Sequence, residues 1–536
     1  MYELYIKKEV GIVNINNLYN FKNPVRHFLD ISGIYYNVNI ENIDIKNLSW
    51  TVPINFRIKK DEDKHRILKI PNILNFICAY ERFKDYPNFN NVNLIDIHKK
   101  LVPNLETGDF AAGEYDFQLE EDFYKLCVYD NLLKLDIKSY YGRIYTHDIN
   151  FEKENDENYL TNLNKGNTNG IIMGNYISLY FAEVYLKNIS EKIEIELNNK
   201  NIDCCFSYFS DDFYFFCNTE DNEKIIDIFD SVLEIFDLER NDKKIEIWTY
   251  LDYNDYNLVE KYWKKIQSES EARFRYDVND NSLYFINQLI YRMSNLKDDK
   301  SKRTFLNTFF KSTYFQEIEI SKYKLEDFNS HQLCYMFKMS PEIMLYSIHI
   351  FKYFDYFIDS KFEKFLKVRY REALLKNYNE EQLYYYYTIK TLDFNSILLD
   401  NINLVYNSNN QLLISYYLKD NLFNDDIIDK LKEKEDEEYW FQNYHLILYT
   451  NLKDNLEESI NKYLIPKYAW DPKHLSDDVI NTRKSFRVKQ ETYLTFYRTI
   501  LELEIPIIKN IDEVENNIKN YIDLKINEKK DVFGEW

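Results

Sequence analysis

Two adjacent aspartates, Asp211 and Asp212, interrupt an otherwise apolar and aromatic run between Cys204 and Cys217. Such residues favour β-strands, so the run predicts two short strands joined by a tight turn that carries both carboxylates. Two neighbouring anions on a hydrophobic hairpin repel each other, and partial burial raises their cost unless cations neutralise them. Oxygen donors without a His or Cys at ligand spacing favour Mg²⁺ or Mn²⁺. A plain acidic hairpin turn would have the same sequence.

Asp136 is the next acidic position that the sequence singles out. Residues Leu132 to Ile137 form an apolar run typical of a buried strand, and Asp136 stands near its end. A carboxylate at the end of a core strand is costly without a partner. We therefore expect Asp136 to join Asp211 and Asp212 as a third ligand of the same metal ions.

Glycine is concentrated in one part of the chain. Four of the nine glycines fall between Gly142 and Gly174, and none occurs between Gly174 and Gly534. Gly170 and Gly174 stand where a polar segment enters a helical pattern, so they could let a ligand approach the backbone closely, although a loop with a helix cap also fits. The second half is expected to need few turns with positive φ.

Basic residues stand at two further places. Lys59 to Pro71 predicts a charged loop followed by a strand from Arg66 to Ile70, and Lys64 and Arg66 would share one strand face. This pair could hold a triphosphate, and a solvated edge strand would look the same. Lys243 and Lys244 lie in a turn between a predicted helix and strand, where Lys244 could reach a leaving pyrophosphate.

The bulk composition bounds the class of protein. A length of 536 residues predicts two or three domains. The net charge of -21 argues against a surface that coats nucleic acid indiscriminately. The six cysteines form no CxxC pair, no apolar run approaches membrane-spanning length, and the first residues lack the apolar core of a signal peptide. We expect a cytoplasmic protein with reduced thiols and no membrane partner.

The second half of the chain predicts helices. Ile286, Leu289, Ile290 and Met293 follow a helical period, and Leu-Lys-Asp-Asn-Leu occurs at both 418–422 and 452–456. An offset of 34 residues is typical of stacked helix pairs, so we expect an α-solenoid over residues 263–536, after a first part of the chain over 1–262. A chance repeat in a biased composition remains the alternative.

Taken in their order along the chain, these motifs resemble those of reverse transcriptases over about residues 50 to 250. Asp136 with Tyr141 is similar to the palm motif that carries the first metal-binding aspartate and the aromatic residue that senses the sugar. Residues 169–178 resemble the glycine-containing motif, and Phe209 to Asp212 stands where the family usually has Tyr-x-Asp-Asp. Asn169, Ile172 and Phe209 depart from the usual Gln, Pro and Tyr.

The resemblance extends to the predicted binding residues and implies an α+β fold, with fingers and an antiparallel palm sheet before the helical repeats. Lys64 and Arg66 match the fingers residues that hold the triphosphate, and Lys244 matches the lysine that follows the catalytic hairpin. It implies a dNTP bound by Lys64, Arg66, Tyr141, Asn169 and Gly170, with Mg²⁺ (or Mn²⁺) on Asp136, Asp211 and Asp212. The palm motifs would span about residues 126–250.

Residues 141–147, the form of the glycine motif and the long remainder further resemble the bacterial abortive-infection (Abi-type) defence reverse transcriptases. This implies a homo-oligomer that synthesises DNA without a nucleic-acid template from a protein hydroxyl, with the product attached to the protein, in defence against phage. A tyrosine is the expected primer, with Tyr35 or Tyr36 as first candidates. Two alternatives are an enzyme that copies a specific noncoding RNA and a degenerate palm that senses nucleotides.

Overall fold

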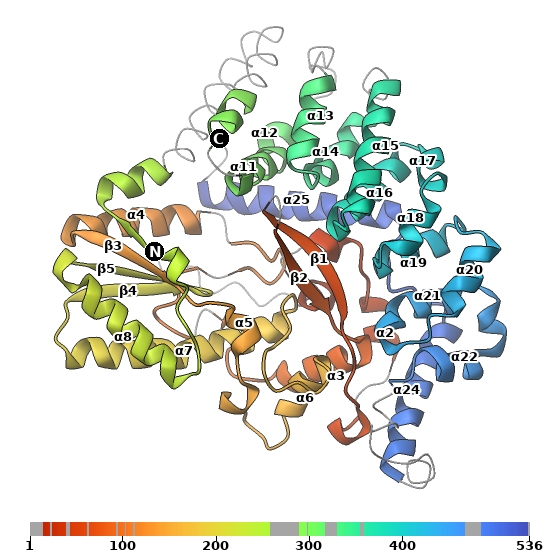
Figure 1. The fold of residues 1–536 in the computed structure, drawn as a ribbon, viewed down its shortest axis with the longest axis horizontal. Helices are drawn as coiled ribbons and strands as arrows, with labels where there is room; N and C mark the ends of the chain where they lie inside the picture. Colours follow the sequence, from red (N-terminus) through yellow and green to blue (C-terminus); the bar gives the residue numbers. More distant parts are fainter. Residues whose placement is uncertain are drawn as a thin grey trace.

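The structure is a computed structural model that describes residues 14–533, except 22–23, 39–42, 62–63, 93–94, 102, 111–112, 258–288, 297–298, 317–329, 354–358 and 467–483. Two small antiparallel sheets lie in the N-terminal half, and the described C-terminal half is helical (Figure 1). The α+β prediction therefore holds as a mixture of helices and small antiparallel sheets. All six cysteines are free thiols. Among the described helices, none has the length and apolar character needed to cross a bilayer.

The larger sheet, named the palm sheet here, has the strand order β4-β5-β3-β6 and is antiparallel throughout. Its strands are β3 (Asn131–Asp136), β4 (Cys204–Phe209), β5 (Asp212–Cys217) and β6 (Glu246–Trp248). The predicted pair of strands joined by a tight turn is confirmed, because Ser210 and Asp211 alone connect β4 to β5.

Helices cover both faces of the palm sheet. On one face lie α7 (Tyr176–Asn199) and α8 (Asn222–Ile235), and the ring of Phe213 meets that of Phe229 in α8 at 5.2 Å (Figure 1). On the other face, Leu132 and Phe216 join an apolar cluster with Phe123 of α4 (Glu114–Val128). Alternate residues of each strand are thus buried on opposite faces, and the sheet is a fixed platform for the acids at its end.

The smaller sheet is a hairpin of β1 (Ile54–Asp61) and β2 (Lys64–Ile70), followed by α3 (Ile73–Phe83). The predicted loop from Lys59 and strand start at Arg66 were wrong, because Lys59 belongs to β1 and β2 begins at Lys64. Lys64 and Arg66 are exposed on β2, whereas Lys59 and Lys69 are half-buried. The short helices of this half include α1 (Ile15–Tyr19), η2 (Pro24–His27), α2 (Ser32–Asn37), η3 (Ile45–Asn47), α5 (Tyr140–Arg143), η5 (Thr146–Asp148), α6 (Glu157–Leu163), η6 (Thr219–Asp221) and η7 (Asp242–Lys244).

The helical half forms an arc around the β1–β2 hairpin (Figure 1). Its helices are α11 (Asp299–Phe310), α12 (Thr313–Gln316), α13 (Ser330–Met339), α14 (Ile343–Phe351), α15 (Ser360–Leu375), α16 (Asn379–Thr391), α17 (Asn395–Leu399), α18 (Ile402–Asn407), α19 (Gln411–Lys419), α20 (Asp425–Lys432), η10 (Glu437–Tyr439), α21 (Trp440–Tyr449), η11 (Asn451–Asn455), α22 (Leu456–Tyr463), α24 (Lys484–Glu502) and α25 (Ile511–Phe533). Helices α14, α16, α19 and α21 stack in succession. Leu289 and Met293 are buried as predicted, whereas Ile286 lies outside the described residues.

The two copies of the pentapeptide differ in structure. In the first copy, Leu418 and Lys419 end α19 and the chain then passes through Asn421 at φ 51°. In the second copy, residues 452–455 belong to the 3₁₀-helix η11. The pentapeptide therefore gives no support to the 34-residue period, although the helices do stack.

The expectation of few positive-φ turns in this half was wrong. The described residues after 288 include five left-handed positions, all taken by residues other than glycine: Asn377, Asp393, Asn409, Asn421 and Glu504. Asparagine and aspartate tolerate this conformation better than other side chains do, so a lack of glycine does not exclude such turns.

The C-terminal segments return to the N-terminal half. The amide of Asp30 donates to the carbonyl of Ile507 at 2.8 Å, and Asn72 Nδ2 donates to the hydroxyl of Tyr497 at 2.6 Å. Buried apolar side chains of both halves belong to one continuous cluster. The predicted boundary between residues 262 and 263 lies outside the described residues.

Candidate active site

The three predicted acids meet at one end of the palm sheet. Asp136 ends β3 and is paired in register with Asp212, the first residue of β5. Asp211 lies in the turn, and its carbonyl accepts a hydrogen bond from the amide of Ile137 at 2.9 Å. Ser210 adopts φ 55°, which lets two residues reverse the chain. Residues far apart in the sequence thus place three carboxylates together.

Two lysines and an asparagine contact these acids. Lys244 Nζ is paired with the carboxylate of Asp136, which is only 2% exposed, and Asn241 Nδ2 donates to its other oxygen at 2.8 Å. Lys134 Nζ lies 3.4 Å from Asp212 Oδ2. Neither Asn241 nor Lys134 was predicted to have a role. The period of two along β3 could have indicated Lys134, because it shares a strand face with Asp136.

The electrostatics show a site with an excess of negative charge. Burial raises the pKa of Asp212; the Lys134 charge lowers it, and the carboxylates of Asp211 and Asp136 raise it further. Burial opposes the charge on Lys244, but the hydrogen bond and the charge of Asp136 prevail and raise its pKa. Lys244 is therefore protonated at neutral pH.

The residues present fit a hard divalent cation by their chemistry. Asp212 Oδ1 is buried without a hydrogen-bond partner, and the donors are all carboxylate oxygens. Over the residues that the structure describes, no three His, Cys, Asp or Glu side chains are already arranged to hold a metal ion. At this site, two of the three acids are paired with lysine instead.

Two further predicted residues lie on other elements, Arg66 on β2 of the hairpin and Tyr141 in α5, which follows β3. Burial raises the pKa of the Tyr141 hydroxyl, with further raising contributions from the charges of Glu183 and Asp211 and an opposing one from Arg66. Tyr141 is thus within electrostatic reach of both Asp211 and Arg66. The side chains of Lys64 and Arg66 are exposed on β2, where a polyanion could reach them.

Residues 169–174, named the glycine segment here, join the site to the hairpin. At Gly170, with φ 86°, an added Cβ would lie 2.9 Å from the carbonyl oxygen of Gly142, next to Tyr141. At Gly174, with φ 129°, it would lie 2.5 Å from Leu68 Cδ1 on β2. The close approach expected of a ligand is therefore made by the chain itself. Asn169 beside Gly170 is exposed.

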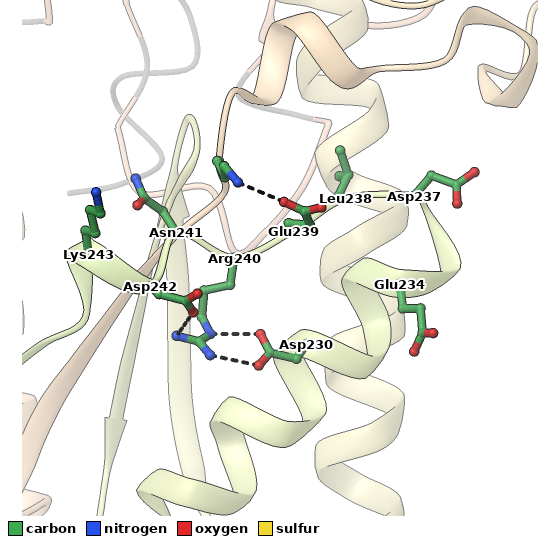
Figure 2. Close-up of a pocket in the computed structure, with 10 residues that line it drawn as sticks. Asp230, Glu234, Asp237, Leu238, Glu239, Arg240, Asn241, Asp242 and Lys243 are labelled. Carbon is green, nitrogen blue, oxygen red and sulfur yellow. Dashed lines mark hydrogen bonds and ion pairs between the residues drawn. The ribbon is translucent and has the colours of Figure 1, made fainter.

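The loop of residues 237–244 fixes the backbone of Asp136. The amide of Asn241 donates to the carbonyl of Asp136 at 2.8 Å, and the amide of Lys138 donates to that of Glu239 at 2.9 Å. The loop lines a cavity of about 750 Å³, where Arg240 forms two hydrogen bonds with Asp230 and Lys138 pairs with Glu239 (Figure 2). These ion pairs hold the loop in place beside the acids.

The candidate priming tyrosines lie elsewhere. Tyr35 and Tyr36 belong to α2, which lies across the β1–β2 hairpin from the palm sheet (Figure 1). The Tyr35 hydroxyl donates to Glu81 at 2.6 Å, whereas Tyr36 is 68% exposed. The structure does not bring them together with the three acids.

Neither protein-family models nor curated protein sequences match this chain. Among solved structures, the telomerase from Candida albicans, in complex with a fragment of telomeric RNA, is similar over 75% of this chain and 67% of that one. The sequence identity is 11% and the TM-score 0.28, values too low to support a conclusion about activity.

Proposed function

We propose that the chain is a nucleotidyltransferase of the reverse-transcriptase type, which adds deoxynucleotides to a hydroxyl group. The observation that carries this proposal is the convergence of Asp136, Asp211 and Asp212 at the turn end of the palm sheet. Three acids that share one partly buried and partly unsatisfied site suit the binding of divalent cations and the transfer of a phosphoryl group.

In the proposed reaction, a hydroxyl oxygen attacks the α-phosphorus of a dNTP, and the bond from that phosphorus to the bridging oxygen breaks. The products are the new phosphodiester and pyrophosphate, and the proton of the attacking hydroxyl passes to solvent. Two Mg²⁺ or Mn²⁺ ions, when bound by the acids, would lower the pKa of the attacking hydroxyl and offset charge in the transition state. Lys244 is protonated and lies at the same carboxylates, so it can supply the proton that pyrophosphate takes.

The hairpin and the glycine segment supply the proposed dNTP site. Arg66 and Lys64 offer a bidentate fork and a point charge for the triphosphate. Tyr141 would lie against the sugar and exclude a 2′-hydroxyl, with Asn169 and Gly170 at the edge of the same site. The charges of Arg66 and Asp211 both act on the pKa of the Tyr141 hydroxyl, which supports this assignment.

The motif resemblance supports a finer proposal. We propose synthesis without a nucleic-acid template, primed by a tyrosine hydroxyl of the protein, by a homo-oligomer that acts in phage defence. The net charge of -21 agrees with it, since little excess positive charge is left to hold a long duplex. Tyr36 is the more accessible of the two priming candidates.

The test is incubation of purified protein with Mg²⁺ and each labelled dNTP, without primer or template. We expect labelled product that remains on the protein after phenol extraction and is released by protease. Product that depends on co-purified RNA would instead select the RNA-templated enzyme. Bound dNTP without any incorporation would select the nucleotide sensor and overturn the polymerase proposal.

A further inference from the structure

The β1–β2 hairpin, which carries Lys64 and Arg66, is held along both edges. On the β2 edge, the amide of Lys69 donates to the carbonyl of Met173 at 3.1 Å. On the β1 edge, the amide of Arg57 donates to Asn379 Oδ1 at 2.8 Å, and that of Lys59 donates to Glu380 Oε1 at 2.7 Å. One edge is thus fixed by the glycine segment and the other by the helical half.

Asn379 and Glu380 act as a substitute for a neighbouring strand. Residues 57 and 59 are two apart, so their amides point out of the same edge of β1. An unpaired edge would leave these donors unsatisfied. The first two residues of α16 supply the two acceptors through their side chains. These two hydrogen bonds therefore fix the position of β1 against the start of α16.

Further contacts fix the same hairpin to the helical half. Lys59 Nζ lies 3.6 Å from Glu381, and the His65 ring lies 5.0 Å from that of Tyr378. Arg303 Nη2 donates to the carbonyl of Lys60 at 2.6 Å. Every residue of α16 from 383 to 389 is buried, so this helix is a rigid support.

Arg57 and Lys59, whose amides are bonded to α16, lie close to Arg66, the residue proposed to bind the triphosphate. In the register of the hairpin, Arg66 is paired with Ile58, and Ile58 stands between Arg57 and Lys59. A shift of β1 away from α16 would therefore move Arg66 directly. Arg66 shares β2 with Lys69, whose amide is bonded to the carbonyl of Met173, so such a shift would displace the proposed triphosphate-binding side chain relative to the glycine segment.

We infer that Asn379 and Glu380 are positioning residues for the nucleotide, through which the helical half sets the place of Lys64 and Arg66. This inference rests on the proposed function. It assigns the helical half a role in dNTP affinity in addition to any role as a scaffold, although neither residue is expected to touch the nucleotide.

The experiment compares the double variant Asn379→Ala, Glu380→Ala with two controls. The variant Asn379→Asp, Glu380→Gln keeps an oxygen acceptor at both positions. Asp425→Ala removes an exposed acid from the first turn of α20, the equivalent place in another helix. Binding is measured in Mg²⁺ with a dNTP whose α–β bridging oxygen is replaced by methylene, which prevents transfer. Amide hydrogen exchange at residues 57 and 59 reports the contact itself.

We expect the alanine double variant to lose exchange protection at residues 57 and 59 and to bind the analogue about tenfold more weakly, which is about 1.4 kcal/mol. Both controls should bind the analogue like the wild type and unfold at a similar thermal midpoint. Should the double variant fail to fold, Glu380→Ala alone is compared in the same way. Lost protection with unchanged affinity overturns the inference. A wild-type protein that binds no analogue overturns the proposed function instead.

Discussion

Asp136 and Asp212 lie directly opposite each other on neighbouring antiparallel strands. Opposed residues in such a pair have Cβ atoms about 4.5–5.5 Å apart, where like charges destabilise the sheet. Lys244 and Lys134 offset this repulsion, yet the pKa of Asp212 stays raised by burial and by the neighbouring acids. The fold thus tolerates a concentration of charge that packing alone does not require, which agrees with the proposed cation site.

Substitution of the acids should therefore separate activity from stability. We expect Asp136→Asn and Asp211→Asn to reduce dNTP incorporation to background, because each removes an anionic oxygen from the proposed cation site. Thermal unfolding should show little loss of stability, since a repulsion is removed with the charge. The matched control is Asp242→Asn in the adjacent loop, whose side chain is 83% exposed and which should retain incorporation. Incorporation by Asp136→Asn or Asp211→Asn would refute the assignment of these acids to the cation site.

Lys244 and a divalent cation should compete for the same carboxylate. We expect Lys244→Met to bind Mn²⁺ more tightly than the wild type in the absence of nucleotide, because Asp136 loses the ammonium group that neutralises it. Incorporation should become slower, since the proposed proton donor is removed. Electron paramagnetic resonance of free Mn²⁺ measures the first effect. Lys243→Met, an exposed neighbour, is the control, and unchanged Mn²⁺ affinity in Lys244→Met would contradict the competition.

Gly170 and Gly142 offer a matched pair of substitutions. In Gly170→Ala, the new Cβ would lie 2.9 Å from a backbone oxygen in a left-handed conformation, so we expect a loss of about 1–3 kcal/mol in unfolding free energy. Because the strained contact adjoins Tyr141, dNTP affinity should fall as well. At Gly142, an added Cβ meets nothing within 4 Å, so Gly142→Ala should be as stable as the wild type. Urea unfolding of both variants checks this difference.

Tyr141 should decide between deoxy and ribo substrates. We expect Tyr141→Ala to gain ribonucleotide incorporation, because the ring no longer occupies the space of a 2′-hydroxyl. The comparison is the ratio of kcat/KM for a dNTP to that for the matching ribonucleotide. Tyr145→Ala, which removes an exposed ring from the same segment, should leave the ratio unchanged. An unchanged ratio in Tyr141→Ala would remove the proposed sugar contact.

The sequence predicted the acids because they break local patterns. Asp211 and Asp212 interrupt an aromatic run and Asp136 ends an apolar strand, and the structure brings the three together. Lys134 obeys the same period of two and could have been predicted. The positions of Tyr35 and Tyr36 could not be predicted, because the local sequence does not determine on which side of the hairpin α2 lies.

Contacts between the two halves had no sequence signal. Asn379 and Glu380 read as an ordinary acidic helix start, and only the tertiary fold brings them to the amides of residues 57 and 59. Conversely, a repeated pentapeptide suggested a common unit and yet adopts two conformations, since the packing of each helix end overrides so short a sequence.

His445 makes the stability of the helical half depend on pH. The side chain is fully buried, with Nδ1 2.9 Å from the carbonyl of Phe441 and Nε2 accepting from the amide of Ile507 at 3.3 Å. Burial lowers its pKa to about 3, while the bond to Phe441 raises it and the charge of Lys419 lowers it. The unfolded chain would take up this proton near pH 6.5. The neutral ring therefore stabilises the fold above pH 6.5, and this contribution is lost as the pH falls towards 3.

The variant His445→Gln isolates this effect. From pH 7 to pH 5, the wild type should lose about 2 kcal/mol more unfolding free energy than the variant, because about 1.4 kcal/mol accompanies each pH unit below 6.5. Urea unfolding at the two pH values gives the difference directly, and the other titrating groups cancel between the two proteins. Parallel pH dependence would mean that His445 takes up its proton equally in the folded and unfolded chains, which its position between Phe441 and Ile507 does not allow.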